Sequence, residues 1–391
     1  MFSNIGQRSM KQLSLAVICM IAATTISRAQ WILIKADGDT ILQRGINHVY
    51  NVEFESAHED FKKVIALYPN HPSGYFLDAM VDWWKIYLDR RNSSGNAQFL
   101  KKIDKVISVC DQMLDSSAHN ITALFFKGGA IGFRGRYHAM RDNMFSAAED
   151  GRIALDIIQE CQKVAPGNHD IMLGTGLYNY YAAALPEKYP ALNTIMVFLP
   201  RGDKILGLAQ LKAAARNGKY AANEAKNILI QAYFDFEKNP LEAMEYARDL
   251  HHQYPMNPAF QRAFGRCLIS LGPLDSMEAC WRNVLIRYIE KRTGYDKLAA
   301  REALYYIGVA RMTRRDLDIS LKYFYKCDEA SRVLDEDPSG FMVKTNLKIG
   351  QIYDVQGKRK LALAQYKKVL DWDDSGGSHE EATRYQQNPY R

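Results

Sequence analysis

Three arginines in one short segment are the side chains of this sequence best suited to binding an anion. Residues 127–141 read KGGAIGFRGRYHAMR and include Arg134, Arg136 and Arg141. A guanidinium group presents a planar fork of N–H donors that matches the oxygens of a carboxylate or a phosphate. The three arginines are therefore candidate ligand-binding residues, although the segment lacks the GxxxxGK[ST] pattern of a phosphate-binding loop.

Four glycines in the same segment need a physical reason, because a glycine costs about 1 kcal/mol relative to alanine inside a helix. Close helix packing at Gly128 and Gly132, with a turn at Gly135, is one explanation. The approach of the backbone to a bound ligand is the other. The sequence leaves both explanations open.

A group of tyrosines follows about forty residues later. Residues 174–181 read GTGLYNYY, and neighbouring residues of a helix point to different sides. At least one ring should therefore face a groove or the solvent. A tyrosine offers a large apolar area and a hydroxyl group to a partner, which makes Tyr178 and Tyr181 candidate binding residues. Tyrosine is also an ordinary core residue of helical repeats.

An apolar segment bracketed by prolines comes next. Residues 191–199 read ALNTIMVFL between Pro190 and Pro200, and Arg201 and Asp203 follow. The prolines favour a loop inserted into a helical hairpin. Such a loop either tucks into the core or presents an apolar patch to a protein or to a membrane surface.

These residues suggest an alternative function as a small-ligand binder or an enzyme. Its pocket would lie between hairpins at residues 119–164 and 169–217, where the candidate side chains converge. However, the sequence has no HExxH, no GxSxG, no paired Cys/His spacing and no dinucleotide fingerprint. The adjacent His251 and His252 point about 100° apart on a helix and cannot chelate one ion. We therefore expect a non-enzymatic protein with no cofactor and no metal.

A repeated spacing predicts the elements that position these residues. Four times a glycine is followed by a small or medium-sized residue twelve positions later and by an aromatic residue four positions beyond that. A helix–turn–helix repeat needs one residue without bulk on each helix where the two axes come closest, and one ring to fill the gap towards the next repeat. The four frames are Gly45/Ala57/Phe61, Gly265/Met277/Trp281, Gly308/Ser320/Phe324 and Gly350/Ala362/Tyr366.

The frames resemble the tetratricopeptide repeat (TPR), in which a tyrosine follows the glycine by three residues and Ala-x-x-x-Phe comes later. The last frame fits best, because it adds Tyr353 to Gly350, Ala362 and Tyr366. Ala243 marks a further unit in which Gln231 replaces the glycine. The resemblance implies a right-handed α-solenoid that binds a protein or peptide on its concave face. The clearest repeats cover residues 38–70 and 224–371.

Helical periodicity extends over nearly the whole chain, and no strand pattern is found. We predict one all-α domain over residues 30–391, built from eight hairpins, with atypical hairpins at 119–217. The predicted helix pairs are 39–51 with 54–67, 72–88 with 97–114, 119–133 with 138–164, 169–185 with 202–217, 222–236 with 240–253, 258–271 with 274–292, 298–312 with 316–333, and 339–355 with 358–371.

The N-terminus has the features of a secretory signal peptide. Arg8 and Lys11 precede an apolar run from Leu13 to Ile26, and small residues flank Arg28. A run of this length is short for a membrane span, which needs about 20 residues. We expect cleavage after Ala29 and a periplasmic or secreted protein; an uncleaved anchor is the alternative.

The net charge of the mature chain bears on the class of partner that it binds, and its cysteines bear on whether it contains a disulfide. Removal of residues 1–29 lowers the formal charge from +7 to +4, and without a basic stripe this excess does not indicate a nucleic-acid partner. Five cysteines remain. They are expected as buried free thiols, with a disulfide between Cys267 and Cys280 as an alternative that sequence alone cannot decide.

Overall fold

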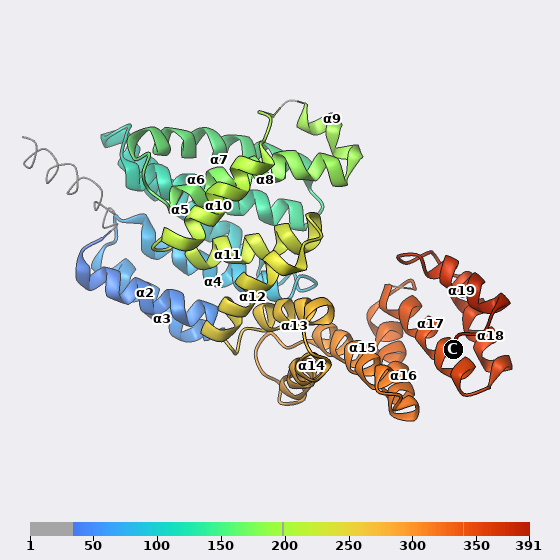
Figure 1. Ribbon diagram of the computed structural model, residues 1–391. Helices are drawn as coiled ribbons and strands as arrows, with labels where there is room; N and C mark the ends of the chain where they lie inside the picture. Colours follow the sequence, from blue (N-terminus) through green and yellow to red (C-terminus); the bar gives the residue numbers. More distant parts are fainter. Residues whose placement is uncertain (1–33, 198, 339) are drawn as a thin grey trace, which may run out of the picture.

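The described part of the chain is almost entirely helical. A computed structural model describes residues 34–197, 199–338 and 340–391 (Figure 1). The predicted signal peptide lies outside these residues. Within them no residue is in a strand, so the all-α prediction is confirmed. None of the described helices is long and apolar enough to cross a membrane.

The helices follow one another as hairpins in which consecutive helices pack together. They are α2 (Ala36–Tyr50), α3 (Phe54–Leu67), α4 (Pro72–Leu88), α5 (Asn96–Ser116), α6 (Ile121–Met140), α7 (Met144–Val164), α8 (Ile171–Lys188), the short η1 (Pro190–Leu192) and α9 (Asn193–Met196), α10 (Lys204–Asn217), α11 (Ala222–Gln231), the π-helical turn η2 (Ala232–Phe236), α12 (Pro240–Gln253), α13 (Pro258–Leu271), α14 (Leu274–Ile289), α15 (Lys297–Thr313), α16 (Leu317–Leu334), α17 (Gly340–Val355), α18 (Arg359–Leu370) and α19 (Ser378–Gln387). All eight predicted hairpins are present, and α19 packs on α18 after the last of them.

The frame residues meet within their hairpins as predicted, with each ring lying directly on the frame glycine of its own hairpin. A Cβ atom built on Gly350 would lie 2.6 Å from a ring carbon of Tyr366, and one on Gly308 would lie 2.8 Å from Phe324. A Cβ atom built on Gly265 would lie 2.9 Å from a ring carbon of Trp281, and one built on Gly45 would likewise meet the ring of Phe61. The small partners Ala57 and Ala362 are fully buried. Tyr353 is half-buried, and its hydroxyl contacts that of Tyr325.

One predicted turn is wrong. Gly135 lies inside α6, which continues to Met140. A Cβ at this position would meet the Cβ of Asp150 at 3.1 Å, so the glycine permits packing against α7. Gly128 packs on Ile158 for the same reason. The turn comes at Asp142, whose φ is 59°.

The hairpin of α6 and α7 contains a further frame, which the spacing of aromatic residues does not show. In three of the four frames the residue seven positions after the frame glycine adopts a left-handed conformation: Val52, Arg315 and Gly357. Asp142 likewise comes seven residues after Gly135, and Lys238 (φ 53°) comes seven residues after Gln231. The hairpin of α6 and α7 therefore has the same register as the regular repeats, although Gly151 occupies the position of the ring.

The first six hairpins curve until the chain meets its own beginning. Helix α2 contacts the segment from α10 to α13: Lys219 pairs with Asp39 at 2.7 Å, and Asn257 donates to the Tyr50 carbonyl at 2.9 Å. Figure 1 shows these hairpins as one rounded body, with the helices from α15 to α19 extending from it as an arm. The described chain thus forms a closed ring and an arm.

Aromatic side chains fill the inside of this ring. The centroids of the aromatic side chains of Tyr50 and Trp84 lie 5.3 Å apart, and those of Trp84 and Phe260 lie 5.5 Å apart. Trp83 meets Phe133 at 5.3 Å. All belong to one hydrophobic core that reaches from Ile34 to Ala310. The concave groove that the resemblance implies is therefore closed over the first six hairpins.

The cysteines are buried as expected. All five in the described residues are free thiols, including Cys267 and Cys280. The Cys280 thiol donates to the Gln261 carbonyl at 3.6 Å. Burial raises the pKa of Cys280 to about 12, so this thiol is poorly reactive at neutral pH.

Candidate interaction surface

Arg134 holds the two helices of its own hairpin together. Its Nε and Nη2 atoms donate to the two carboxylate oxygens of Asp150 at 2.9 and 2.7 Å. Asp150 is only 5% exposed, and this hydrogen-bonded partner raises the pKa of Arg134. Arg44 and Asp60 make the same two-pronged contact between α2 and α3.

The two pairs occupy the same positions of the repeat. Each arginine directly precedes its frame glycine, Gly45 or Gly135. Each aspartate comes sixteen residues after its arginine. A histidine on the next turn of the first helix approaches the same aspartate, at 3.8 Å for His48 and 3.9 Å for His138. Arg134 therefore has the structural role of Arg44.

Arg136 is also engaged within the fold, inside the ring. It donates to Glu224 of α11 at 2.6 Å, and its guanidinium lies 4.8 Å from the ring centroid of Trp83 and 5.0 Å from that of Phe133. Glu224 is 5% exposed. This pair joins α6 to a helix almost ninety residues away in the sequence.

Arg141 fixes the turn after α6 against the turn after α4. It donates to the Arg90 carbonyl, to the Asn92 carbonyl at 3.2 Å and to Asn96 Oδ1 at 2.8 Å. The first three candidate arginines thus bind groups of this chain rather than pointing together into one pocket.

The remaining candidates divide between the core and the insertion. Tyr181 packs against Phe236 at 5.5 Å and belongs to the core. Tyr178 donates to the Pro200 carbonyl at 2.9 Å, and burial raises its pKa to about 12. Asp203 caps α10 by accepting from the Leu206 amide at 2.9 Å. Arg201 is exposed and makes no hydrogen bond or ion pair with any described residue.

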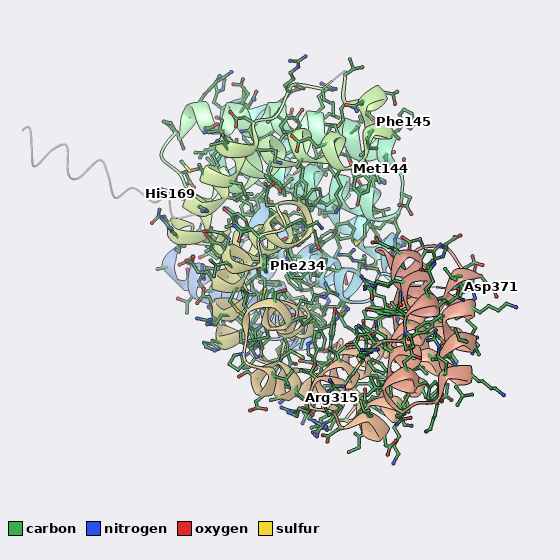
Figure 2. The ribbon with its side chains drawn as sticks, turned by 45° about the vertical axis from the view of Figure 1, so that its right-hand side comes forward. Met144, Phe145, His169, Phe234, Arg315 and Asp371 are labelled. Atoms are coloured by element: carbon green, nitrogen blue, oxygen red, sulfur yellow. The ribbon has the colours of Figure 1, made fainter. Side chains whose placement is uncertain are left out.

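Several apolar side chains reach the solvent at the insertion. Val197 is 72% exposed and Ile205 is 83% exposed, and Tyr189 and Leu206 are also exposed. The predicted loop contains the helical turns η1 and α9, which pack on α7 and α8. Because α7 and α8 run antiparallel, the start of α7 lies at this same end. Phe145 there is 76% exposed (Figure 2). We call these five residues the α8–α10 tip.

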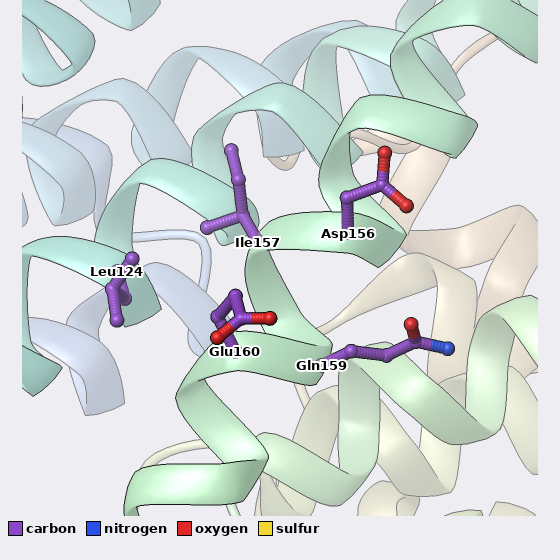
Figure 3. A pocket seen from close by; sticks show the side chains of 5 residues that line it. All are labelled: Leu124, Asp156, Ile157, Gln159 and Glu160. Carbon is purple, nitrogen blue, oxygen red and sulfur yellow. The ribbon is translucent and has the colours of Figure 1, made fainter. Parts of the chain in front are cut away.

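Neither of two cavities in the described part of the chain is lined by any of the seven candidates. One, of about 330 Å³, lies between α6 and α7 and is lined by Leu124, Asp156, Ile157, Gln159 and Glu160. Figure 3 shows Ile157 and Glu160 on the side nearer Leu124. The other, of about 230 Å³, lies beside α2. The described residues contain no group of three or more His, Cys, Asp or Glu side chains that could hold a metal ion.

Comparison with known proteins finds similarity only among solved structures. No protein-family model and no curated protein sequence matches the chain. A Rap protein complexed with competence and sporulation factor is 12% identical over 89% of this chain and 78% of that chain, with a TM-score of 0.35. The APC/C heterotetramer Cut9–Hcn1 is 12% identical over 90% and 76%, with a TM-score of 0.41. The human IFIT1 dimer with PPP-AAAA is 11% identical over 91% and 85%, with a TM-score of 0.39. At these identities and scores, the function of none of these proteins transfers to this chain.

Proposed function

We propose that this protein is a non-enzymatic interaction protein whose α8–α10 tip binds a protein partner. The observation that carries the proposal is the exposure of Phe145, Val197 and Ile205 at one end of the molecule. Single exposed apolar residues are common, but a group of them marks a contact site. Arg201 adds an exposed, unpaired cation beside this group, which suits a partner with a carboxylate close to its apolar surface.

The geometry of the insertion supports this function because it limits the entropy lost on binding. Tyr178 ties Pro200 to α8, and Asp203 caps the helix that follows. Gly202 lies so close to α8 that a Cβ atom there would be 2.9 Å from the Cβ of Ala182. In this proposal Arg201 contacts the partner, whereas Tyr178 and Asp203 position the insertion.

A crosslinking experiment tests the tip. A photoreactive amino acid at position 197 is expected to give an adduct with one protein in living cells, and the same residue at position 289 is expected to give none. Ile289 is a matched control because it is 69% exposed and ends α14, away from the insertion (Figure 1). The affinity of the identified partner should then fall at least tenfold in a Val197→Glu/Ile205→Glu variant and stay unchanged in Ile289→Glu.

Two results would overturn this assignment. Equal crosslinking from positions 197 and 289 would mean that the tip is not a specific contact. Adducts with lipid alone, together with binding of the purified protein to phospholipid vesicles, would instead identify residues 191–199 as a peripheral membrane contact.

We further propose that the protein works in the cell envelope or outside the cell after export. The basic residues, apolar run and small residues of positions 1–29 support this proposal. Protein purified from its native source is expected to begin at Gln30 when its N-terminus is sequenced. A chain that begins at Met1 would show that the segment is retained as an anchor.

A further inference from the structure

The turn between α12 and α13 is where the chain closes on its own beginning. The Tyr254 hydroxyl donates to Asn47 Oδ1 at 3.0 Å, and Asn257 donates to the Tyr50 carbonyl at 2.9 Å. Asn47 and Tyr50 belong to α2, whereas Tyr254 and Asn257 lie between α12 and α13. The ring of hairpins is therefore held closed in part by residues 254–257.

Arg287 of α14 fixes this turn through uncharged acceptors. It donates to the Pro255 carbonyl, to Gln261 Oε1 at 2.9 Å and to the Tyr295 hydroxyl at 2.7 Å. No carboxylate among the described residues pairs with this half-buried guanidinium. An uncompensated positive charge therefore lies against the turn.

His251 lies beside the same turn, near the end of α12. Its imidazole stacks on the ring of Phe264 of α13, with the centroids 5.2 Å and the planes 22° apart. Its Nδ1 atom is buried and has no hydrogen-bond partner in the described part of the chain. One nitrogen of a neutral imidazole carries no hydrogen, whereas both nitrogens of the imidazolium are donors. Protonation would therefore leave a buried N–H at Nδ1 without an acceptor.

The charges around His251 also oppose its protonation. Burial, then the positive charge of Arg287 and then that of His252, lower the pKa of His251 to about 4. The charged residues of the neighbouring helices α11 and α13 are paired with other residues: Glu224 with Arg136, Lys226 with Asp249, and both Arg262 and Arg266 with Glu302. The face of Phe264 would return part of the cost through a cation–π contact, but it offers the N–H no acceptor.

We propose that closure of the ring of hairpins is sensitive to acid, with His251 as the group that responds. A protonated His251 is relieved by leaving the space between α12 and α13, or by displacing Arg287 from the turn. Either movement loosens residues 254–257 and weakens their bonds to Asn47 and Tyr50. This device is independent of the partner proposed for the α8–α10 tip.

The effect has a defined sign and pH range. The pKa of His251 is lower in the folded chain than its ordinary value of 6.5, which applies to the unfolded chain. The stability that this residue contributes is therefore complete above pH 6.5 and is lost as the pH falls towards 4. Between pH 7 and pH 5, the equilibrium constant for opening should rise about twentyfold because of His251 alone.

Urea unfolding of the mature chain at pH 7 and pH 5 tests this proposal. His251→Phe keeps an aromatic ring against Phe264 and removes the titrating nitrogens, so the change between the two pH values should be about twentyfold smaller than in the parent chain. His119→Phe is the matched control, because His119 is exposed in the turn between α5 and α6. It should leave the pH dependence of the parent chain unchanged.

Hydrogen exchange locates the change. At pH 5, after correction for the intrinsic exchange rate, amides of residues 45–50 and 258–264 should lose protection in the parent chain but not in His251→Phe, whereas those of α18 should keep it. Equal pH dependence in the parent chain and a folded His251→Phe variant, or equal loss of protection in α18, would overturn the proposal. If His251→Phe does not fold, an NMR titration of His251 decides: a pKa clearly below 6.5 supports the proposal, and one at or above 6.5 contradicts it.

Discussion

Replacement of Arg136 by glutamine is expected to lower the free energy of unfolding by about 3–5 kcal/mol, the usual effect of removing one member of a buried ion pair. Glu224 would keep its charge inside the ring, where it is 5% exposed and loses its partner at 2.6 Å. The guanidinium also lies over the rings of Trp83 and Phe133, so packing is lost together with the charge.

Denaturant unfolding of two further variants separates this effect from a general effect of losing an arginine. Arg152→Gln breaks an exposed pair with Asp156 and should change the free energy of unfolding by less than about 0.5 kcal/mol. Adding Glu224→Gln to Arg136→Gln removes the unpaired charge and should restore part of the loss. If Arg136→Gln and Arg152→Gln were equally stable, Arg136 would be free for a partner.

Gly207→Ala is expected to cost about 3 kcal/mol, the upper end of the usual effect of overpacking. The new Cβ atom would lie 2.5 Å from the Tyr180 backbone nitrogen and 2.8 Å from its Cα atom. A backbone cannot rotate aside as a flexible side chain can, so α8 and α10 would have to move apart. That movement would also disturb the insertion between them.

Gly151→Ala provides a control of opposite sign. Gly151 is inside α7, and a Cβ atom there would have open space around it. Alanine at this position should stabilise the protein by about 0.5–1 kcal/mol through its higher helix propensity. Thermal melts of both variants measure the contrast, and a Gly207→Ala variant as stable as the parent chain would mean that α8 and α10 do not approach so closely.

The local part of the fold could be predicted because its determinants lie within about twenty residues of each other. Gly350 and Tyr366 belong to one hairpin, so their spacing alone predicts that they meet. The frame at Gly135 cannot be recognised from an aromatic residue, because Gly151 stands where the other frames have a ring. The shared pattern of Arg44 with Asp60 and Arg134 with Asp150 was a usable signal, and it would have identified Arg134 as a packing residue.

The long-range part could not be predicted in this way. Glu224 is 88 residues from Arg136, and no spacing in the sequence connects them. The same holds for Asn47 and Tyr254, whose bond helps to close the ring of hairpins. In the sequence, an arginine that pairs inside the closed ring of hairpins therefore cannot be distinguished from an arginine that binds a ligand.

Closure of the ring has a consequence for how the chain folds. In a linear array each repeat contacts only its neighbours, so folding can begin at any repeat and one end can unfold while the rest stays folded. Here Tyr254 bonds Asn47 across 207 residues, and Lys219 reaches Asp39 across 180. Contacts between residues so far apart in sequence slow folding, because a long loop must close before they form. Helix α2 therefore stays incompletely buried until the chain has been synthesised as far as α13. The first six hairpins should also unfold as a single cooperative unit.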